Sequence, residues 1–85
     1  MQTTNLRSEN TAPAESAQAV TPNDSADLAG LSRALYIGSY GNANVDMADG
    51  TTILFLGLSS GQILPIRAKR VRLTNTTATN IIALY

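Results

Sequence analysis

The chain has 85 residues, with six lysines and arginines against six aspartates and glutamates, and it contains no histidine, cysteine or tryptophan. This length allows one small domain, and the net charge of zero argues against a general nucleic-acid binder, which carries a surplus of positive charge. The missing cysteine and histidine exclude disulfides, thiol nucleophiles, imidazole bases and nearly all transition-metal sites, so we expect no enzyme, no metal and no cofactor.

Residues 1–30 are polar and contain few large apolar side chains, namely Met1, Leu6, Val20 and Leu28. So few anchors bury too little surface to offset the entropy of ordering, and we expect an extended, flexible N-terminal arm that can be removed up to residue 28 without unfolding the rest. The arm lacks the basic start and apolar core of a signal peptide. The longest apolar run of the chain, 53–56, is far shorter than the ~20 residues of a membrane span, so we expect no membrane partner.

Residues 31–85 form the second predicted unit, because 21 of these 55 residues are Val, Ile, Leu, Met, Phe or Tyr, in short runs separated by turn residues. The runs predict strands at 33–38, 43–48, 51–57, 62–67, 70–74 and 80–85. Asp49-Gly50 predicts a two-residue hairpin turn, since both residues tolerate a positive φ. Six strands without helical periodicity indicate an all-β domain, a small antiparallel β-sandwich or barrel.

The predicted strand at 51–57 is apolar on both faces. Thr51, Ile53 and Phe55 point one way, and Thr52, Leu54 and Leu56 point the other. The strand is then either a central one beneath the arm or part of a subunit interface. We favour the interface, because a small core supplies only ~3–5 kcal/mol and usually needs staples or partners. The interface candidates of apolar or aromatic type are Tyr36, Ile53, Leu54, Phe55, Leu56 and Tyr85.

A change of parity marks the following basic segment. Ile66 and Ala68 lie on even positions, whereas Val71 and Leu73 lie on odd ones. One extra residue near Lys69–Arg70 would restore a common apolar face, which predicts a β-bulge there. The basic interface candidates are Arg67, Lys69, Arg70 and Arg72, and the bulge would display Arg67, Arg70 and Arg72 outward. Aromatic residues that could stack bases are not adjacent in sequence, so we expect a protein partner and no nucleic acid.

Charge is distributed unevenly along the chain. Residues 1–61 contain two basic and six acidic residues, a net charge of −4, whereas residues 62–85 contain four basic residues and no acid, a net charge of +4. Copies of the chain could therefore meet acidic to basic in a salt-sensitive assembly. The spacing of the aspartates, Asp24, Asp27, Asp46 and Asp49, matches no known cation-binding loop and indicates no catalytic pair.

Several segments together resemble a known family. They are AVTPNDSADL at 19–28, RALYIG at 33–38, ILPIR at 63–67 with Val71, and TTATNIIALY at 76–85. In this order and spacing they resemble the small spike base proteins of gene transfer agents and related tailed phages. The resemblance covers roughly residues 19–85, and it has no catalytic residues to transfer.

The resemblance implies a non-enzymatic virion protein on the capsid exterior, arranged as a homo-oligomer, with a pentameric ring at fivefold vertices favoured. Its implied partners are the major capsid protein, contacted through the N-terminal arm, and a spike or fibre protein. Two alternatives stay open. One is a capsid cement or decoration protein. The other is a small glycan-binding module, in which Tyr36 or Tyr40 would lie beside Asn42 and Asn44.

Overall fold

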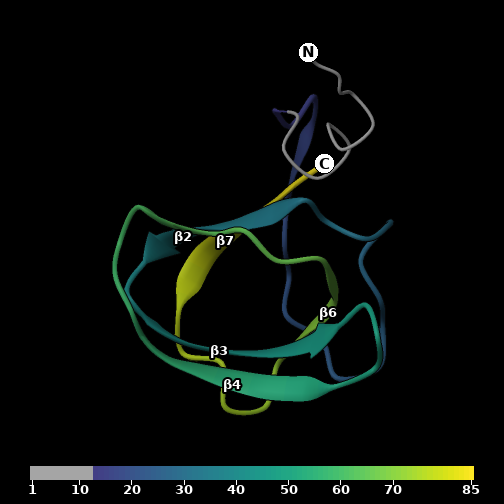
Figure 1. The fold of residues 1–85 in the computed structure, drawn as a ribbon. Helices are drawn as coiled ribbons and strands as arrows, with labels where there is room; N and C mark the ends of the chain where they lie inside the picture. Colours follow the sequence, from purple (N-terminus) through teal and green to yellow (C-terminus); the bar gives the residue numbers. More distant parts are fainter. Residues whose placement is uncertain (1–12) are drawn as a thin grey trace.

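A computed structural model describes residues 13–85, which form two antiparallel sheets packed face to face (Figure 1). The strands are β1 (Ala17–Ala19), β2 (Ala34–Ser39), β3 (Gly41–Met47), β4 (Thr52–Leu58), β5 (Gln62–Leu64), β6 (Ala68–Arg72) and β7 (Thr79–Leu84). Sheet A has the order β1-β7-β2-β5, and sheet B has the order β4-β3-β6. The predicted all-β sandwich is therefore confirmed, and the six expected strands correspond to β2–β7.

The seventh strand, β1, lies within the expected arm. It pairs antiparallel with β7, with Ala17 opposite Leu84 and Ala19 opposite Ile82. Its sequence Ala-Gln-Ala has neither β-branched residues nor large apolar ones, so no pattern in the sequence indicated a strand. The strand forms because β7 presents an edge on which to pair.

The core lies between the two sheets. Along β2, for example, Leu35 and Ile37 are fully buried, and Val45 of β3 faces them from the other sheet. One polar side chain belongs to this interior. The hydroxyl of Ser32 donates to the carbonyl oxygen of Ile66 and accepts from the N–H of Ala68, both at 3.0 Å, which joins the start of β6 to the segment before β2.

The predicted bulge is present at Lys69. On β3, Asp46 lies opposite Arg70 and its neighbour Met47 lies opposite Ala68, so Lys69 is the extra residue on β6. Ala68 and Val71 are consequently both buried, although their sequence positions differ in parity. The bulge explains how one strand keeps a single apolar face.

The hairpin between β3 and β4 differs from the prediction. The N–H of Met47 donates to the Thr51 carbonyl oxygen at 2.7 Å, which makes a three-residue loop of 48–50 instead of a two-residue turn. Of the loop residues only Gly50 has a positive φ, of 94°. The Asp49 carboxylate accepts from the N–H and the hydroxyl of Thr51 at 3.0 and 2.7 Å, and this side-chain bond favours the longer loop.

The strand predicted at 51–57 corresponds to β4, which is an edge strand of sheet B. The alternative of a central strand was therefore wrong. The two predicted faces are correct, because Ile53 and Phe55 lie opposite the buried Val45 and Ala43, whereas Leu54 lies opposite Asn44 on the outer face.

The two lateral sides of the sandwich differ. On one side, the segment 20–28 runs along β6: the N–H of Asn23 donates to the Val71 carbonyl oxygen, and the N–H of Leu28 to that of Lys69, both at 2.9 Å. On the other side, the edges of β4 and β5 are not covered by any described residue. The N-terminal segment thus closes one side of the sandwich and leaves the other open.

Candidate interaction surfaces

The outer face of sheet B carries an ion-pair cluster, which we call the acid–base cluster: Asp24, Asp27, Asp46, Arg70 and Arg72. A guanidinium nitrogen of Arg70 lies 2.7 Å from Asp27 and another 3.7 Å from Asp46, while Nε of Arg72 lies 2.8 Å from Asp46. Arg70 also donates to the backbone oxygen of Asp24 at 3.0 Å. The cluster joins the N-terminal segment to β6 and β3.

Electrostatics within this cluster follow from its hydrogen bonds. The hydrogen bond from Arg72, reinforced by one from the Thr52 hydroxyl, lowers the pKa of Asp46 below its ordinary value, and the same contact raises the pKa of Arg72. Bonds from the N–H and hydroxyl of Thr74 lower the pKa of Asp24. All of these contacts favour the charged forms of Asp24, Asp46 and Arg72.

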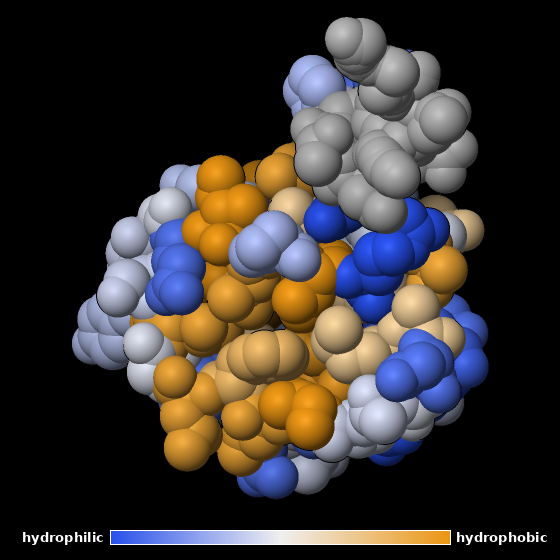
Figure 2. Space-filling view, viewed as in Figure 1, coloured by the Kyte–Doolittle hydropathy of each residue, from blue (hydrophilic) through white to orange (hydrophobic). Residues whose placement is uncertain are grey.

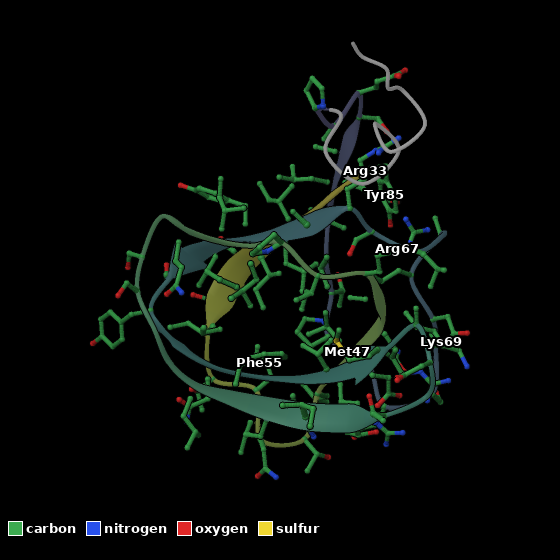
Figure 3. All side chains as sticks on the ribbon, in the orientation of Figure 1. Arg33, Met47, Phe55, Arg67, Lys69 and Tyr85 are labelled. Carbon is green, nitrogen blue, oxygen red and sulfur yellow. The ribbon has the colours of Figure 1, made fainter. Side chains whose placement is uncertain are left out.

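The pairing narrows the list of basic interface candidates. The charges of Arg70 and Arg72 are neutralised within their own chain, which reduces their availability to an acidic neighbour. The side chains of Arg67 and Lys69 are exposed and make no hydrogen bond or ion pair with the residues from 13 onwards. Figure 3 shows both on the side of the molecule that also holds Arg33 and the C-terminal Tyr85. We call this side the arm end.

Sheet A presents an apolar outer face. Tyr36 lies opposite Ile82 on β7 and Ile63 on β5, and Ala34 lies opposite Leu84. Ile63 is 54% exposed. The four strands of sheet A contain no charged residue, so nothing on this face resists contact with another apolar surface. Of its larger side chains only Tyr36 was a candidate from the sequence. The adjacent pair Ile81-Ile82 was the available signal for the others, since neighbours in a strand face opposite ways.

The open side of the sandwich continues this apolar surface. Ile53, Leu54 and Leu56 of β4 are exposed along the uncovered edge, and β5 contributes Ile63. Figure 2 shows the resulting apolar surface around β4 and above it. Phe55, by contrast, points inward and packs against the core, as Tyr85 does. The structure therefore brings together three of the four β4 candidates, while Phe55 and Tyr85 have mainly internal contacts.

A third surface lies at the end of the sandwich opposite the arm end. We call it the loop end, made of residues 38–42, 56–61 and 73–80. Asn42 joins its segments. Its backbone N–H donates to the Thr77 hydroxyl at 2.9 Å, and its carbonyl oxygen accepts from the N–H groups of Thr77 and Ala78. Its side-chain oxygen accepts from the Gly57 N–H at 3.0 Å. The N–H of Tyr40 donates to the Ser60 hydroxyl at 3.0 Å. These bonds make the loop end an ordered surface.

Gly41 permits the close approach of these loops. Its φ is 149°, and a Cβ atom there would lie 2.5 Å from the backbone nitrogen of Ala78. Asn75 has a left-handed φ of 67°, which asparagine tolerates better than other residues with a side chain. The sequence signal for this surface was the density of Gly, Asn, Ser and Thr, which indicated loops but not that they meet.

The structure separates the two tyrosines of the glycan-binding alternative. Tyr36 lies on the outer face of sheet A, whereas Tyr40 lies at the loop end with Asn42. The side-chain oxygen of Asn42 accepts from the Gly57 N–H, and the side-chain amide of Asn44 donates to the Thr74 carbonyl oxygen at 3.1 Å. These two polar atoms are thus engaged within the chain.

The described residues hold no group of three or more acidic side chains placed to bind a metal ion. Within the same residues, no helix is long and apolar enough to cross a membrane. The aspartates instead stabilise the fold, in the acid–base cluster and in the β3–β4 turn.

The fold defines a small all-β sandwich, and comparison with known proteins gives its family. No family model matches the chain, and neither does any curated protein. Among solved structures, the chain is similar to one described as the capsid of a native GTA particle computed with C5 symmetry, GTA standing for gene transfer agent. The two are 36% identical, with a TM-score of 0.81, over 89% of this chain and 88% of the other.

This chain belongs to the family of that gene transfer agent capsid chain. The match extends over nearly all of both chains, which means that the whole domain is shared and not one motif. The protein is accordingly a virion structural protein of the gene transfer agent and phage type. The resemblance to gene transfer agent proteins that the sequence showed is therefore confirmed. The role of a spike base is a proposal.

Proposed function

We propose that the chain is a spike base protein, which forms rings on the capsid exterior at the fivefold vertices and anchors a spike or fibre protein. The observation that carries the proposal is the 36% identity with a chain of a GTA capsid structure that was computed with C5 symmetry. A fivefold arrangement of this chain agrees with that symmetry. The proposal includes no catalytic step and no cofactor.

The ring contact uses the two apolar surfaces. The outer face of sheet A and the open side between β4 and β5 meet at Ile63, which belongs to an edge strand of sheet A and is more than half exposed. An uncovered edge strand flanked by exposed apolar side chains is a site where another chain adds. The opposite side is closed by the N-terminal segment. A contact between the open side of one copy and the outer face of sheet A of the next would join two different surfaces, which makes it heterologous, as ring closure requires.

The capsid contact uses the arm end. The N-terminal arm, residues 1–30, reaches the sandwich beside Tyr85, since the N–H of Glu15 donates to the Tyr85 carbonyl oxygen at 2.6 Å. Arg67 and Lys69 lie at the same end (Figure 3). An arm with two basic side chains beside it suits an acidic shell surface. The arm would supply most of the contact area by wrapping over the shell surface, and the positive charges of Arg67 and Lys69 would orient the contact.

The mass of the purified protein in solution tests the ring contact. We expect the unmodified chain to form a closed pentamer, and Ile63→Glu to reduce it to monomers, because the variant places a charge on the apolar surface. Ala48→Glu adds the same charge in the exposed β3–β4 loop and serves as the matched control. Native mass spectrometry at micromolar concentration gives the copy number. An unmodified chain that stays monomeric at high concentration contradicts the ring, and so does a pentamer that persists in Ile63→Glu.

A cement or decoration protein is the alternative within the same class. It would occupy threefold or hexamer positions of the shell, so its place on the particle distinguishes it from a spike base.

A further inference from the structure

The loop end has two properties that set it apart from the rest of the surface. The first is the absence of charge: none of the residues 38–42, 56–61 and 73–80 is charged. Two charged side chains adjoin it and are held within the chain: the carboxylate of Asp24 accepts from the N–H and hydroxyl of Thr74 at 3.0 and 2.7 Å, and Arg72 is paired with Asp46. In the described chain, the exposed basic residues Arg67 and Lys69 lie at the opposite end.

The second property is the high exposure of its large apolar side chains. Tyr40 is 77% exposed, Leu56 69% and Leu73 60%, which makes them the three most exposed large apolar residues among those described. Each lies close to the hydrogen bonds that join the loops: Tyr40 is bonded to Ser60, Leu56 precedes Gly57, and Leu73 precedes Thr74. Exposed anchors on a rigid backbone lose little entropy on binding, which is the property of interface hot spots.

We propose that the loop end is the docking surface for the outward protein partner, the spike or fibre protein, and that this partner presents an uncharged surface with apolar recesses for Tyr40, Leu56 and Leu73. Ser59, Ser60 and Thr77 would form the polar rim around these anchors. The inference rests on the proposed function, because it takes the arm end as the side that faces the capsid. It adds which surface carries the spike and what chemistry that surface selects.

The chemistry favours a protein over a glycan. Two of the three anchors are leucines, whereas sugar rings stack on aromatic side chains. Three hollows of the described chain are lined by residues between Ser16 and Leu31 together with Ala48, Lys69 and Tyr85, so none of these three reaches the loop end. A projecting surface with apolar anchors and a neutral polar rim is typical of protein recognition.

The test uses particles assembled with the full chain, in which Tyr40→Ala and Leu73→Ser are introduced singly and together. Leu56 is left unchanged, because its side chain also belongs to the open side that the proposed ring uses. Tyr40→Phe and Leu73→Met keep an apolar side chain at the same positions and are the matched controls. Quantitative mass spectrometry of purified particles measures two quantities: copies of this chain per particle, and copies of each other outward protein. Thermal unfolding of the purified variants establishes that they fold.

We expect the double variant to retain this chain on the particle and to lose the outward protein about tenfold or more, while Tyr40→Phe and Leu73→Met retain both. Retention of the outward protein by the double variant overturns the inference and leaves the proposed ring untouched. Loss of this chain itself from the double variant also overturns it, because the loop end would then face the shell. If no other outward protein of the unmodified particle requires this chain for its attachment, the proposed role as a spike anchor is contradicted. If the variant keeps every protein but its particles no longer bind cell-surface glycan, the loop end is a sugar site and the inference is wrong.

Discussion

Nε of Arg72 lies 2.8 Å from a carboxylate oxygen of Asp46 in the same chain, across two neighbouring strands of sheet B. The sequence suggested that basic residues near the C-terminus would meet acidic residues of another copy. The bulge at Lys69 instead sets β6 so that Arg70 and Arg72 share a face with Asp46. Much of the charge separation along the chain is therefore cancelled by folding.

Removal of the Asp46 carboxylate should weaken this link. We expect Asp46→Asn to lower the free energy of unfolding by about 1–2 kcal/mol, because Arg72, Arg70 and the Thr52 hydroxyl lose a charged partner that is only 7% exposed. Urea unfolding followed by circular dichroism measures the change. Glu15→Gln removes the same charge outside the cluster and should be neutral. Equal loss in both variants would contradict a specific role of Asp46.

The same carboxylate predicts a pH dependence. Because hydrogen bonds from Arg72 and Thr52 lower the pKa of Asp46 below 3.8 in the folded state, its contribution to stability is complete above that pH and is lost as the pH falls through the lowered value. Stability should therefore fall as the pH is lowered below about 4, and it should fall less in Asp46→Asn. The pKa values of Asp24 and Asp49 are also lowered, so these two residues leave a smaller pH dependence of stability in the variant. Parallel pH profiles of the two proteins would refute this assignment.

Deletion of Lys69 tests the bulge. Without the extra residue, Val71 would turn to the outer face and Arg72 to the core, so we expect the deletion variant not to fold. Lys69→Ala keeps the residue count and should change stability by less than about 0.5 kcal/mol, because the exposed side chain has no partner among residues 13–85. Proton NMR dispersion separates the two outcomes. A folded deletion variant would mean that β6 tolerates either register.

Truncation of the arm should have two distinct results. Removal of residues 1–12 leaves every described contact in place, and we expect unchanged stability. Removal of residues 1–28 takes away β1, the ion pair of Asp27 and the packing of Val20 and Leu28 against the core, at a cost of about 3 kcal/mol or more. That the domain still folds without residues 1–28 stays a prediction, now with an expected loss of stability. Thermal unfolding of both truncations measures the difference, and equal melting temperatures would contradict that loss.

Salt should have little influence on the proposed ring. Since its contact surfaces are apolar and Arg70 and Arg72 are paired within the chain, we expect the oligomer to persist in 1 M NaCl. Light scattering across a salt series provides the measurement. Dissociation at moderate salt would favour the acidic-to-basic contact between copies that the charge distribution first suggested.

The sequence predicted the fold more fully than the surfaces. Strand positions, the two faces of β4 and the bulge at Lys69 follow from local alternation, which a chain reveals without knowledge of its partners. The partner of Arg72 could not be predicted, because Asp46 is 26 residues away and their meeting depends on strand order. Strand β1 could not be predicted for a related reason, because Ala17–Ala19 forms a strand by pairing with the edge of β7.

The candidate surfaces also differ in whether they could be predicted from the sequence. Ile53, Leu54 and Leu56 were identified because one strand was apolar on both faces. The apolar outer face of sheet A combines side chains from β2, β5 and β7, which become neighbours only after folding. The loop end likewise brings together three separate loops through Asn42.

The central claim, that this chain is a ring-forming spike base at a capsid vertex, is tested most directly by a cryo-electron microscopy reconstruction of particles that contain it. We predict five copies around each fivefold vertex on the outside of the shell, with Arg67 and Lys69 toward the shell and Tyr40 pointing away. Copies at threefold or hexamer positions, or on the inside of the shell, would contradict the claim.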